Sequence, residues 1–251
     1  MKIFTSMTQW ESWRGAMQKS PIGFVPTMGA LHQGHLSLVR ASQKNNAITI
    51  VSVFINPMQF DDSADLEAYP ADFSKDLEQL EVAGVDAVIL PHVAQIYADD
   101  YRFKVTENDF SQRLCGAHRP GHFDGVLTVV MRLLNLVRPD NAYFGEKDYQ
   151  QYQLIRDMAA AFFMPLNVVA CATVREPDGL AMSTRNQHLD KRSRAQAAVL
   201  YATLKQSQTA DEVRKTLIGQ GFTVDYVEDI ADRRLVAAWL GNTRLIDNVE
   251  I

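Results

Sequence analysis

The sequence has few cysteines, no excess of basic residues and no long apolar run. Its two cysteines, Cys115 and Cys171, are too few for a disulfide framework and lack the spacings of metal-binding cysteines. Both stand beside apolar residues, so we expect small buried side chains in a reducing compartment. Lysine and arginine number 25 against 30 acidic residues, a net charge of -5. That acidic balance argues against a protein that mainly holds nucleic acid.

Neither membrane insertion nor secretion is indicated. The longest apolar stretch, residues 47–55, is interrupted by Thr49 and Ser52, and it is far shorter than the roughly 20 residues that span a bilayer. The first nine residues contain no apolar segment or cleavage pattern of a signal peptide. We therefore expect a cytoplasmic protein. With 251 residues, 47% of them hydrophobic, the chain can bury a substantial core, which excludes general disorder.

Strand-like and helix-like patterns alternate over the first two thirds of the chain. The strand-like runs are short and apolar, as in strands buried on both faces; they cover residues 22–25 (ended by Pro26), 48–55, 85–90, 142–144 and 166–170. Helical spacing opens near Leu36 and recurs over residues 72–83, 126–137 and 150–163. This alternation predicts an α/β fold with a Rossmann-like, doubly wound parallel sheet.

The pattern changes near residue 175. Residues 176–186 are loop-like and contain a Pro-Asp-Gly turn. Helical patterns at residues 191–207 and 211–218, a strand-like alternation at 222–230 and a mixed stretch at 235–251 follow. We therefore expect two domains, a Rossmann-like domain over residues 1–175 and a small C-terminal α+β lid domain over residues 176–251.

Charge is distributed unevenly. Between Met58 and Asp100 there are eleven acidic residues (61, 62, 65, 67, 72, 76, 78, 81, 86, 99 and 100) and one basic residue, Lys75. We interpret this segment as a solvated outer helix and its loops. Over residues 101–200 the balance reverses to thirteen basic against ten acidic residues, which suits an anionic ligand.

The most informative motif is residues 26–35 (PTMGALHQGH), between the first strand and the first helix. In open α/β sheets ligands bind at the carboxyl ends of strands, and a helix N-terminus attracts phosphate. Gly29 and Gly34 permit close approach, and His32 and His35 could both face the ligand. The motif is no Walker A loop, because His35 follows Gly34 where lysine is required. Two alternatives stay open: ordinary packed or surface histidines, and a metal site, although no third ligand stands nearby in sequence.

This His-x-Gly-His placement resembles the nucleotidylyltransferase superfamily, whose members cleave ATP between the α- and β-phosphates. Four further segments narrow the resemblance; they are residues 54–60 (FINPMQF), 119–126 (RPGHFDGV), 144–151 (FGEKDYQQ) and 178–186 (DGLAMSTRN). In this order they resemble the pantothenate synthetase (pantoate–β-alanine ligase) family, and the similarity continues to residues 243–248 (TRLIDN). Thr184 stands where that family usually has serine, but the hydroxyl is kept.

The resemblance implies an enzyme of coenzyme A precursor biosynthesis. Such a ligase condenses pantoate with β-alanine to give pantothenate, AMP and diphosphate through a pantoyl-adenylate. ATP is then a substrate, and a divalent cation, Mg²⁺, is expected to screen its phosphates, although no residue is assigned to the metal. The resemblance also implies a homodimer. From the charge balance and the short apolar runs we expect neither nucleic acid nor a membrane as a partner. The apolar positions of residues 126–137, more numerous than one sheet face requires, favour the dimer.

Four residues suit adenylation, in which charge develops on phosphate oxygens and positioning matters more than covalent help. His32 and His35 can donate hydrogen bonds to those oxygens. Lys147 supplies a point charge to the phosphates, and Arg185 can hold the departing diphosphate with its planar fork. Alternatively, Lys147 belongs to a solvated trio with its acidic neighbours and Arg185 is an ordinary loop cation.

Gln59 and Gln151 are the candidates for binding the acid substrate, because a neutral amide can donate and accept without repelling an anion. The resemblance places pantoate on both and β-alanine near Gln59. Met28, Phe54 and Phe60 would form an apolar wall for the gem-dimethyl group of pantoate. Alternatively, the two glutamines are ordinary exposed polar residues.

The resemblance assigns the remaining contacts. Arg119 and His122 are expected to support the site or the partner subunit. The residues assigned to ATP are Met28, Gly29, Ala30, Leu31, His32, Gln33, Gly34, His35, Gly145, Glu146, Lys147, Asp148, Val174, Met182, Ser183, Thr184 and Arg185. Two other functions compete: a nucleotidylyltransferase that leaves AMP on its product, and a non-enzymatic nucleotide-sensing module.

Overall fold

The computed structural model describes residues 1–17, 20–60, 66–67, 69–70, 72–206 and 209–251. These residues group into two compact units. Unit 1 comprises Met1–Leu31, His35–Gly145 and Gln150–Cys171, and unit 2 comprises His32–Gly34, Glu146–Tyr149 and Ala172–Ile251. Two short segments, residues 32–34 and 146–149, therefore group with the C-terminal part of the chain. The division at residue 175 expected above remains a prediction.

Unit 1 is built on a parallel sheet, as the alternating pattern predicts. Its described strands are β1 (Lys2–Phe4), β2 (Ile22–Thr27), β3 (Ile48–Val53), β4 (Ala87–Ile89), β5 (Asn141–Gly145) and β6 (Asn167–Cys171). They lie in the order β1-β4-β3-β2-β5-β6, and every pair is parallel. The chain order reverses direction at β2, so the ends of β2 and β5 lie at the topological switch point where such sheets bind ligands.

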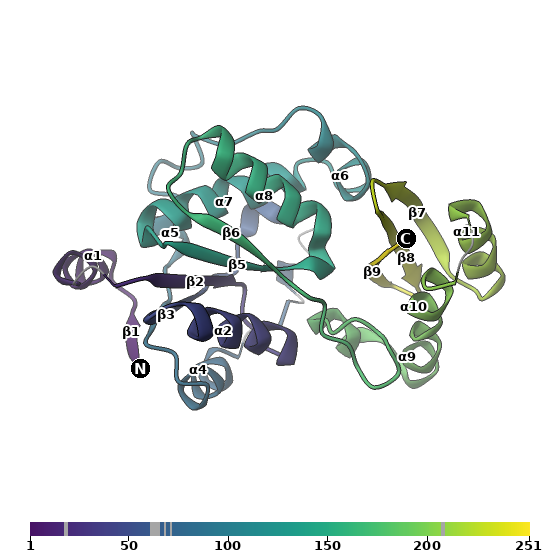
Figure 1. The fold of residues 1–251 in the computed structure, drawn as a ribbon, viewed down its shortest axis with the longest axis horizontal. Coiled ribbons are helices and arrows are strands. Elements are labelled where there is room, and N and C mark those ends of the chain that lie inside the picture. Colours follow the sequence, from purple (N-terminus) through teal and green to yellow (C-terminus); the bar gives the residue numbers. More distant parts are fainter. Residues whose placement is uncertain (18–19, 61–65, 68, 71, 207–208) are drawn as a thin grey trace. The chain divides into compact units, whose positions relative to one another are not determined.

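Helices cover both faces of this sheet (Figure 1). The helices α2 (Gln33–Asn45) and α4 (Phe73–Val82) lie on one face, and α7 (His122–Val137) and α8 (Tyr149–Ala161) lie on the other. On the first face, apolar side chains of the strands pack with those of the helices; they include Val25, Leu38, Val51, Leu80 and Val88. The expected doubly wound α/β class is therefore confirmed.

The sequence patterns did not predict strand β1 and helix α1. Helix α1 (Met7–Ala16) begins after Ser6, whose hydroxyl accepts from the Gln9 amide. Trp10 is fully buried and its Nε1 donates to the carbonyl of Leu136 at 3.0 Å. The remaining short elements of this unit are η1 (Pro57–Gln59), α5 (Val93–Ile96), η2 (Phe110–Gln112) and α6 (Cys115–His118).

The prediction that the strand beginning at Ile22 is ended by Pro26 is wrong, because β2 continues to Thr27. Proline has no backbone N–H to donate to a neighbouring strand, so it is unfavourable inside a sheet. Here β2 pairs with β5 only at Gly23 and Phe24, whereas its pairing with β3 extends to Thr27. Pro26 therefore stands where one neighbour has already diverged.

Unit 2 contains a three-stranded antiparallel sheet in the order β7-β8-β9. Its strands are β7 (Thr223–Ile230), β8 (Arg233–Leu240) and β9 (Thr243–Glu250), and its helices are η3 (Glu146–Asp148), η4 (Thr184–His188), α9 (Lys191–Ala197), α10 (Val199–Leu204) and α11 (Ala210–Gly219). The core joins helices to sheet through Leu200, Val213, Leu217, Phe222 and Val236. This confirms the expected C-terminal α+β part.

Three predictions for this unit need correction. The single helical pattern over 191–207 is two helices that meet at Ala198, and Ser207 lies outside the described residues. The loop predicted at 176–186 already contains the start of η4. The mixed stretch at 235–251 is largely the hairpin of β8 and β9.

Of the acidic segment singled out in the sequence, residues 61, 62 and 65 lie outside the described part of the chain.

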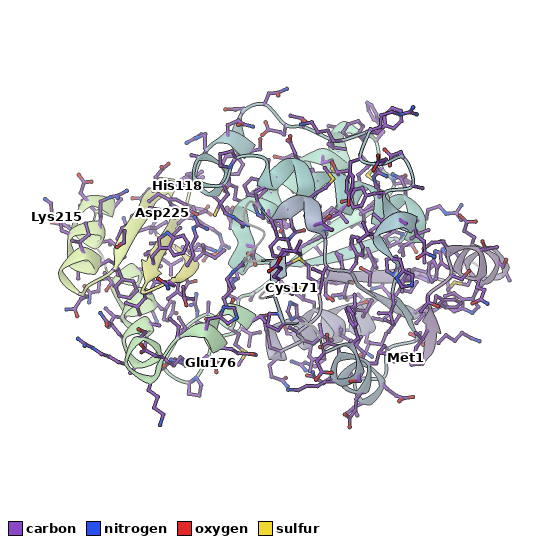
Figure 2. All side chains as sticks on the ribbon, turned by 180° about the vertical axis from the view of Figure 1, so that it is seen from behind. Met1, His118, Cys171, Glu176, Lys215 and Asp225 are labelled. Atoms are coloured by element: carbon purple, nitrogen blue, oxygen red, sulfur yellow. The ribbon has the colours of Figure 1, made fainter. Side chains whose placement is uncertain are left out.

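The cysteines and the apolar segments agree in part with expectation. Cys115 is buried but Cys171, labelled in Figure 2, is half-buried, so only the first behaves fully as a core residue; both are free thiols. Within the described ranges, no helix combines the length and apolar character that crossing a membrane requires.

Candidate active site

The turn that leaves β2 is held by a buried carboxylate of α4. The two oxygens of Asp76 accept the backbone N–H groups of Ala30 and Leu31, each at 2.8 Å. Gly29 has φ +87°, and a Cβ there would lie 2.8 Å from Asp76 Oδ2. Only glycine fits this left-handed, crowded position. Gly29 and the Asp76 carboxylate, which is 46 residues after Ala30, therefore together determine the backbone conformation of this turn.

Asp76 is an exception to the interpretation of the acidic segment as a solvated outer helix and its loops. It is 2% exposed, and it lies on the same face of α4 as the fully buried Leu80, four residues on. By contrast, Phe73 is 45% exposed. The sequence indicated the burial of Asp76 only through its position four residues before Leu80, since residues four apart share a helix face.

His32 is held as a neutral imidazole in unit 2. Its Nδ1 accepts the backbone N–H of Gly34 at 3.1 Å, so the ring proton of the neutral form is on Nε2. Burial, reinforced by the positive charge of Lys147, lowers the pKa of His32 from 6.5 to about 4. At pH 7 the ring therefore offers a single N–H donor. A Cβ on Gly34 would lie 2.7 Å from the imidazole and 3.9 Å from Cβ of Met182, so the motif glycine lets these three residues come together.

Lys147 is in η3, where its side chain is 20% exposed and its ammonium lies 3.5 Å from a carboxylate oxygen of Asp148. Its other acidic neighbour, Glu146, instead pairs with Arg233 of β8 at 2.9 Å. The segment is therefore not a freely solvated charge trio. Its positive charge is near enough to His32 to depress the histidine's pKa.

The chain from Val174 to Arg185 is folded back on itself. Arg175 and Ala181 form an antiparallel bridge, and the Met182 amide donates to the carbonyl of Val174 at 3.0 Å. Ser183 caps η4 by accepting from the Arg185 amide at 3.3 Å. The turn that the sequence places at Pro-Asp-Gly uses Gly179 at φ +91°. This segment thus presents residues 182–185 on a locally hydrogen-bonded scaffold.

In unit 1, Gln59 at the end of η1 is held on several sides. Its side-chain Oε1 accepts from Nδ2 of Asn56 at 3.1 Å. Its backbone carbonyl accepts from Arg119 Nη2 at 3.1 Å and contacts His122 Nδ1 at 2.7 Å. A Cβ on Gly125 would lie 2.3 Å from the carbonyl oxygen of Met58, so α7 packs directly on η1. Arg119 and His122 therefore contact the backbone of Gln59.

The two glutamines that begin α8 differ. Gln150 is 4% exposed; its Nε2 donates to the carbonyls of Phe110 and Arg113, and its Oε1 accepts the Cys115 amide. Gln151, the candidate for the acid substrate, is half-buried. Phe54 is 5% exposed at the end of β3. Gln150 thus has a structural role, because its side chain holds the backbone of residues 110, 113 and 115.

The candidate residues divide between the units. Unit 1 holds Met28–Leu31, His35 in the first turn of α2, Gln59, Gly145 at the end of β5, and Gln151. Unit 2 holds His32–Gly34, Glu146–Asp148, Val174 and Met182–Arg185. Within unit 2 the structure brings His32, Gly34, Lys147 and Met182 together. In the part of the chain that is described, no three His, Cys, Asp or Glu side chains gather as metal ligands.

Comparison with known proteins decides the family. The Pantoate-beta-alanine ligase family matches residues 2–250. The chain belongs to the pantoate–β-alanine ligase family. It is 51% identical over 250 residues to the pantothenate synthetase of Bdellovibrio bacteriovorus, covering 100% of this chain and 99% of that one. The pantothenate synthetase of Legionella pneumophila is 46% identical over 249 residues, with 99% of each chain covered.

Solved structures of pantoate–β-alanine ligases have the same fold. The Francisella tularensis ligase, complexed with β-γ ATP and β-alanine, superposes with a TM-score of 0.95 at 37% identity, covering 100% of this chain and 97% of that one. The Thermus thermophilus pantothenate synthetase gives a TM-score of 0.90 at 38% identity, covering 100% and 99%. The resemblance drawn from the sequence is confirmed over the full chain.

Proposed function

We propose that this protein condenses pantoate with β-alanine to form pantothenate, consuming ATP and releasing AMP and diphosphate. The full-length match to the ligase family supports the overall reaction. The observation that carries the adenylate route is the neutral His32 imidazole beside the charge of Lys147. An N–H donor and an ammonium together suit phosphate oxygens on which negative charge develops.

The reaction runs in two steps. A carboxylate oxygen of pantoate bonds to the α-phosphorus as the bond to the bridging oxygen breaks, and diphosphate leaves. The amine of β-alanine then bonds to the acyl carbon. The bond from that carbon to the oxygen shared with phosphorus breaks, so that AMP leaves with this oxygen, and the new amide nitrogen loses a proton. Activation must come first, because an amine does not displace oxide from a carboxylate.

Each candidate has a role in these steps. His32 and His35 donate to oxygens of the α-phosphate, Lys147 neutralises the phosphates, and Arg185 holds the departing diphosphate. Gln59 and Gln151 bind pantoate, and Gln59 also contacts β-alanine. The wider ATP contacts come from residues 28–35, 145–148, 174 and 182–185, as the family resemblance implies.

Mg²⁺, when bound, would supply further charge neutralisation at the phosphates. It usually keeps several waters and is held by one or two carboxylates together with substrate phosphates. A dedicated cage of side-chain ligands is therefore not required for this role.

The homodimer, the cytoplasmic location and the two-domain division with a closing lid remain proposals. The apolar face of α7 no longer supports the dimer, because Val126, Leu133, Leu134 and Val137 are already at most 3% exposed within one chain. The dimer therefore rests on family resemblance alone. Light scattering that finds only the 28.2 kDa monomer at micromolar concentration would overturn it.

Isotope exchange tests the adenylate route. Labelled diphosphate should enter ATP when pantoate and Mg²⁺ are present and β-alanine is absent. A requirement for β-alanine, or the accumulation of ADP, would contradict the mechanism. Pantothenate and AMP formed after β-alanine is added would exclude both a nucleotidylyltransferase that keeps AMP on its product and a non-enzymatic sensor.

A further inference from the structure

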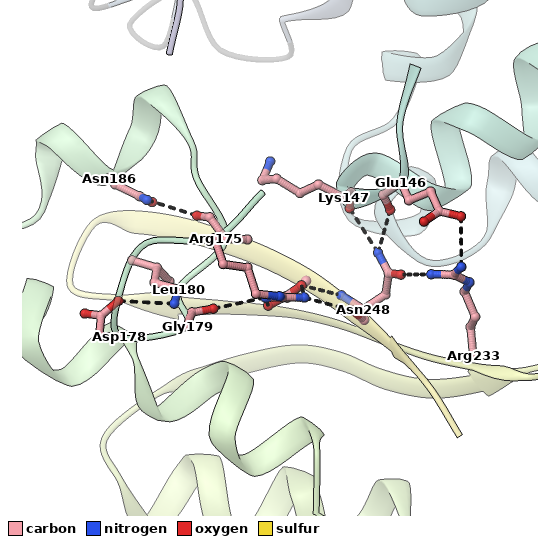
Figure 3. A network of polar contacts seen from close by, with 11 residues as sticks. Glu146, Lys147, Arg175, Asp178, Gly179, Leu180, Asn186, Arg233 and Asn248 are labelled. Atoms are coloured by element: carbon pink, nitrogen blue, oxygen red, sulfur yellow. Dashed lines mark hydrogen bonds and ion pairs between the residues drawn. The ribbon is translucent and has the colours of Figure 1, made fainter. Parts of the chain in front are cut away.

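The sequence motif at 243–248 has no part in the mechanism above, yet its last residue contacts the segment that carries Lys147. Asn248 of β9 is 4% exposed. Its Nδ2 donates to the backbone carbonyls of Glu146 and Lys147, at 2.7 and 3.2 Å (Figure 3). Its Oδ1 accepts from Nη1 of Arg233 at 2.8 Å. With two carbonyls on one side and a guanidinium on the other, the amide has one favourable orientation.

Arg233 of β8 holds the same segment through side chains. Besides Asn248, its guanidinium contacts the Glu146 carboxylate at 2.9 Å and lies 4.6 Å from the centre of the Tyr149 ring. A planar guanidinium can satisfy these partners at once, which an ammonium cannot. Residues 146–149 are therefore held at backbone and side chains by one pair of neighbouring strands.

The residue before Asn248 connects this contact to the other candidate segment. Asp247 is 3% exposed and accepts Arg175 at 2.6 and 3.0 Å and the Asn248 amide at 2.8 Å. Arg175 also donates to the carbonyl of Gly179 at 3.1 Å. Asp247 therefore ties β9 to the fold at 174–182. Asn248 ties the same strand to η3, as Figure 3 shows.

We propose that Asn248 is a positioning residue of the ligase, which fixes the backbone at Lys147 so that the ammonium reaches the phosphates of ATP. This inference rests on the proposed function of Lys147. A lysine side chain is a flexible four-carbon stem, so its backbone origin limits where its charge can act. Displacements of about 1 Å in a catalytic group cost on the order of 10²-fold in rate.

The test is Asn248→Leu, which keeps similar volume, adds no charge and removes both hydrogen-bond functions. We expect diphosphate–ATP exchange to slow by at least about tenfold. A double-mutant cycle with Lys147→Ala then shows whether Asn248 acts through the lysine. In the Lys147→Ala background, Asn248→Leu should change the rate less than about twofold. Arg244→Lys is the matched control, because Arg244 is on the same strand but pairs with Asp225.

Titration of His32 by NMR is a readout that a general structural role would not move. Displacing the Lys147 ammonium removes one cause of the low His32 pKa, so Asn248→Leu should raise that pKa from about 4 toward its value in Lys147→Ala. Arg244→Lys should leave it unchanged. Arg233→Lys, which keeps the charge but not the fork, should give a smaller shift in the same direction.

Two results would overturn the proposal: independent, multiplicative losses in the double-mutant cycle, or an Asn248→Leu protein that is folded and has an unchanged His32 pKa. A failure of the proposed function is distinguishable. If Lys147→Ala itself leaves exchange intact, Lys147 is not part of the mechanism, while the His32 titration still reports whether Asn248 places the ammonium.

Discussion

Replacing Asp76 by asparagine should loosen the loop that leads into the His-x-Gly-His motif. Each carboxylate oxygen accepts one backbone N–H, from Ala30 and Leu31, at 2.8 Å. Asparagine is isosteric but has only one acceptor oxygen, so its NH₂ group must face the second N–H. Hydrogen bonds to charged groups contribute about 1.5–3 kcal/mol, and leaving a buried donor unpaired costs a similar amount. We therefore expect Asp76→Asn to lower the free energy of unfolding by about 2–3 kcal/mol.

Activity should fall as well, because the freed residues immediately precede His32. Denaturant unfolding gives the stability change, read as a lower midpoint at an unchanged slope, and diphosphate–ATP exchange gives the activity, expected to drop on the order of tenfold or more. Asp72→Asn on the same helix is the control: Asp72 is the N-cap that accepts the Lys75 amide, and asparagine caps equally well. If both variants unfold at the same denaturant concentration, the two hydrogen bonds do not hold the loop.

Three further predictions concern the motif residues and the loop at 174–186. His35→Ala should slow exchange by on the order of 10²–10³-fold with less effect on ATP affinity, and retention of half the activity would remove His35 from the mechanism. Because the His32 pKa falls from 6.5 to about 4 on folding, the unfolded chain takes up this proton first as pH drops; stability should decline between those pH values, and a His32→Gln variant should flatten that decline in pH-dependent unfolding. Amides around Gly179 should exchange more slowly with an ATP analogue and pantoate bound; unaltered exchange would contradict ordering of this segment.

The parallel sheet could be predicted from the sequence, and the candidate site residues could be proposed from it, because each depends on a local pattern. Short β-branched runs alternating with helical spacing are sufficient to indicate a doubly wound sheet. Likewise, the candidate His32 stands between β2 and α2 and the candidate Lys147 just after β5, at the strand ends where such sheets bind ligands. The strand through Pro26 could not be predicted, because it depends on where β5 diverges from β2, a property of pairing and not of the run itself.

The hairpin of β8 and β9 was missed for a related reason. Strand β9 breaks the apolar alternation with Asp247 and Asn248, which are 3% and 4% exposed. Buried polar residues in a strand look like a loop unless their partners are known. Those partners, Arg175 and Arg233, come from other elements, so the pattern of the strand alone gave no indication of burial.

Asp76 and Asn248, whose supporting contacts the sequence did not reveal, share one property: each binds backbone atoms of a distant segment. Asp76 binds the N–H groups of residues 30 and 31, and Asn248 binds the carbonyls of residues 146 and 147. Every residue carries such groups, so nothing in the partner's identity marks the contact. A catalytic side chain is constrained by what it must do chemically, whereas its support is constrained only by where the backbone must be held. On the proposed mechanism, chemically suitable residues at 32 and 147 are therefore not enough. The loops that carry them also require a buried carboxylate and a buried amide, each from a distant element.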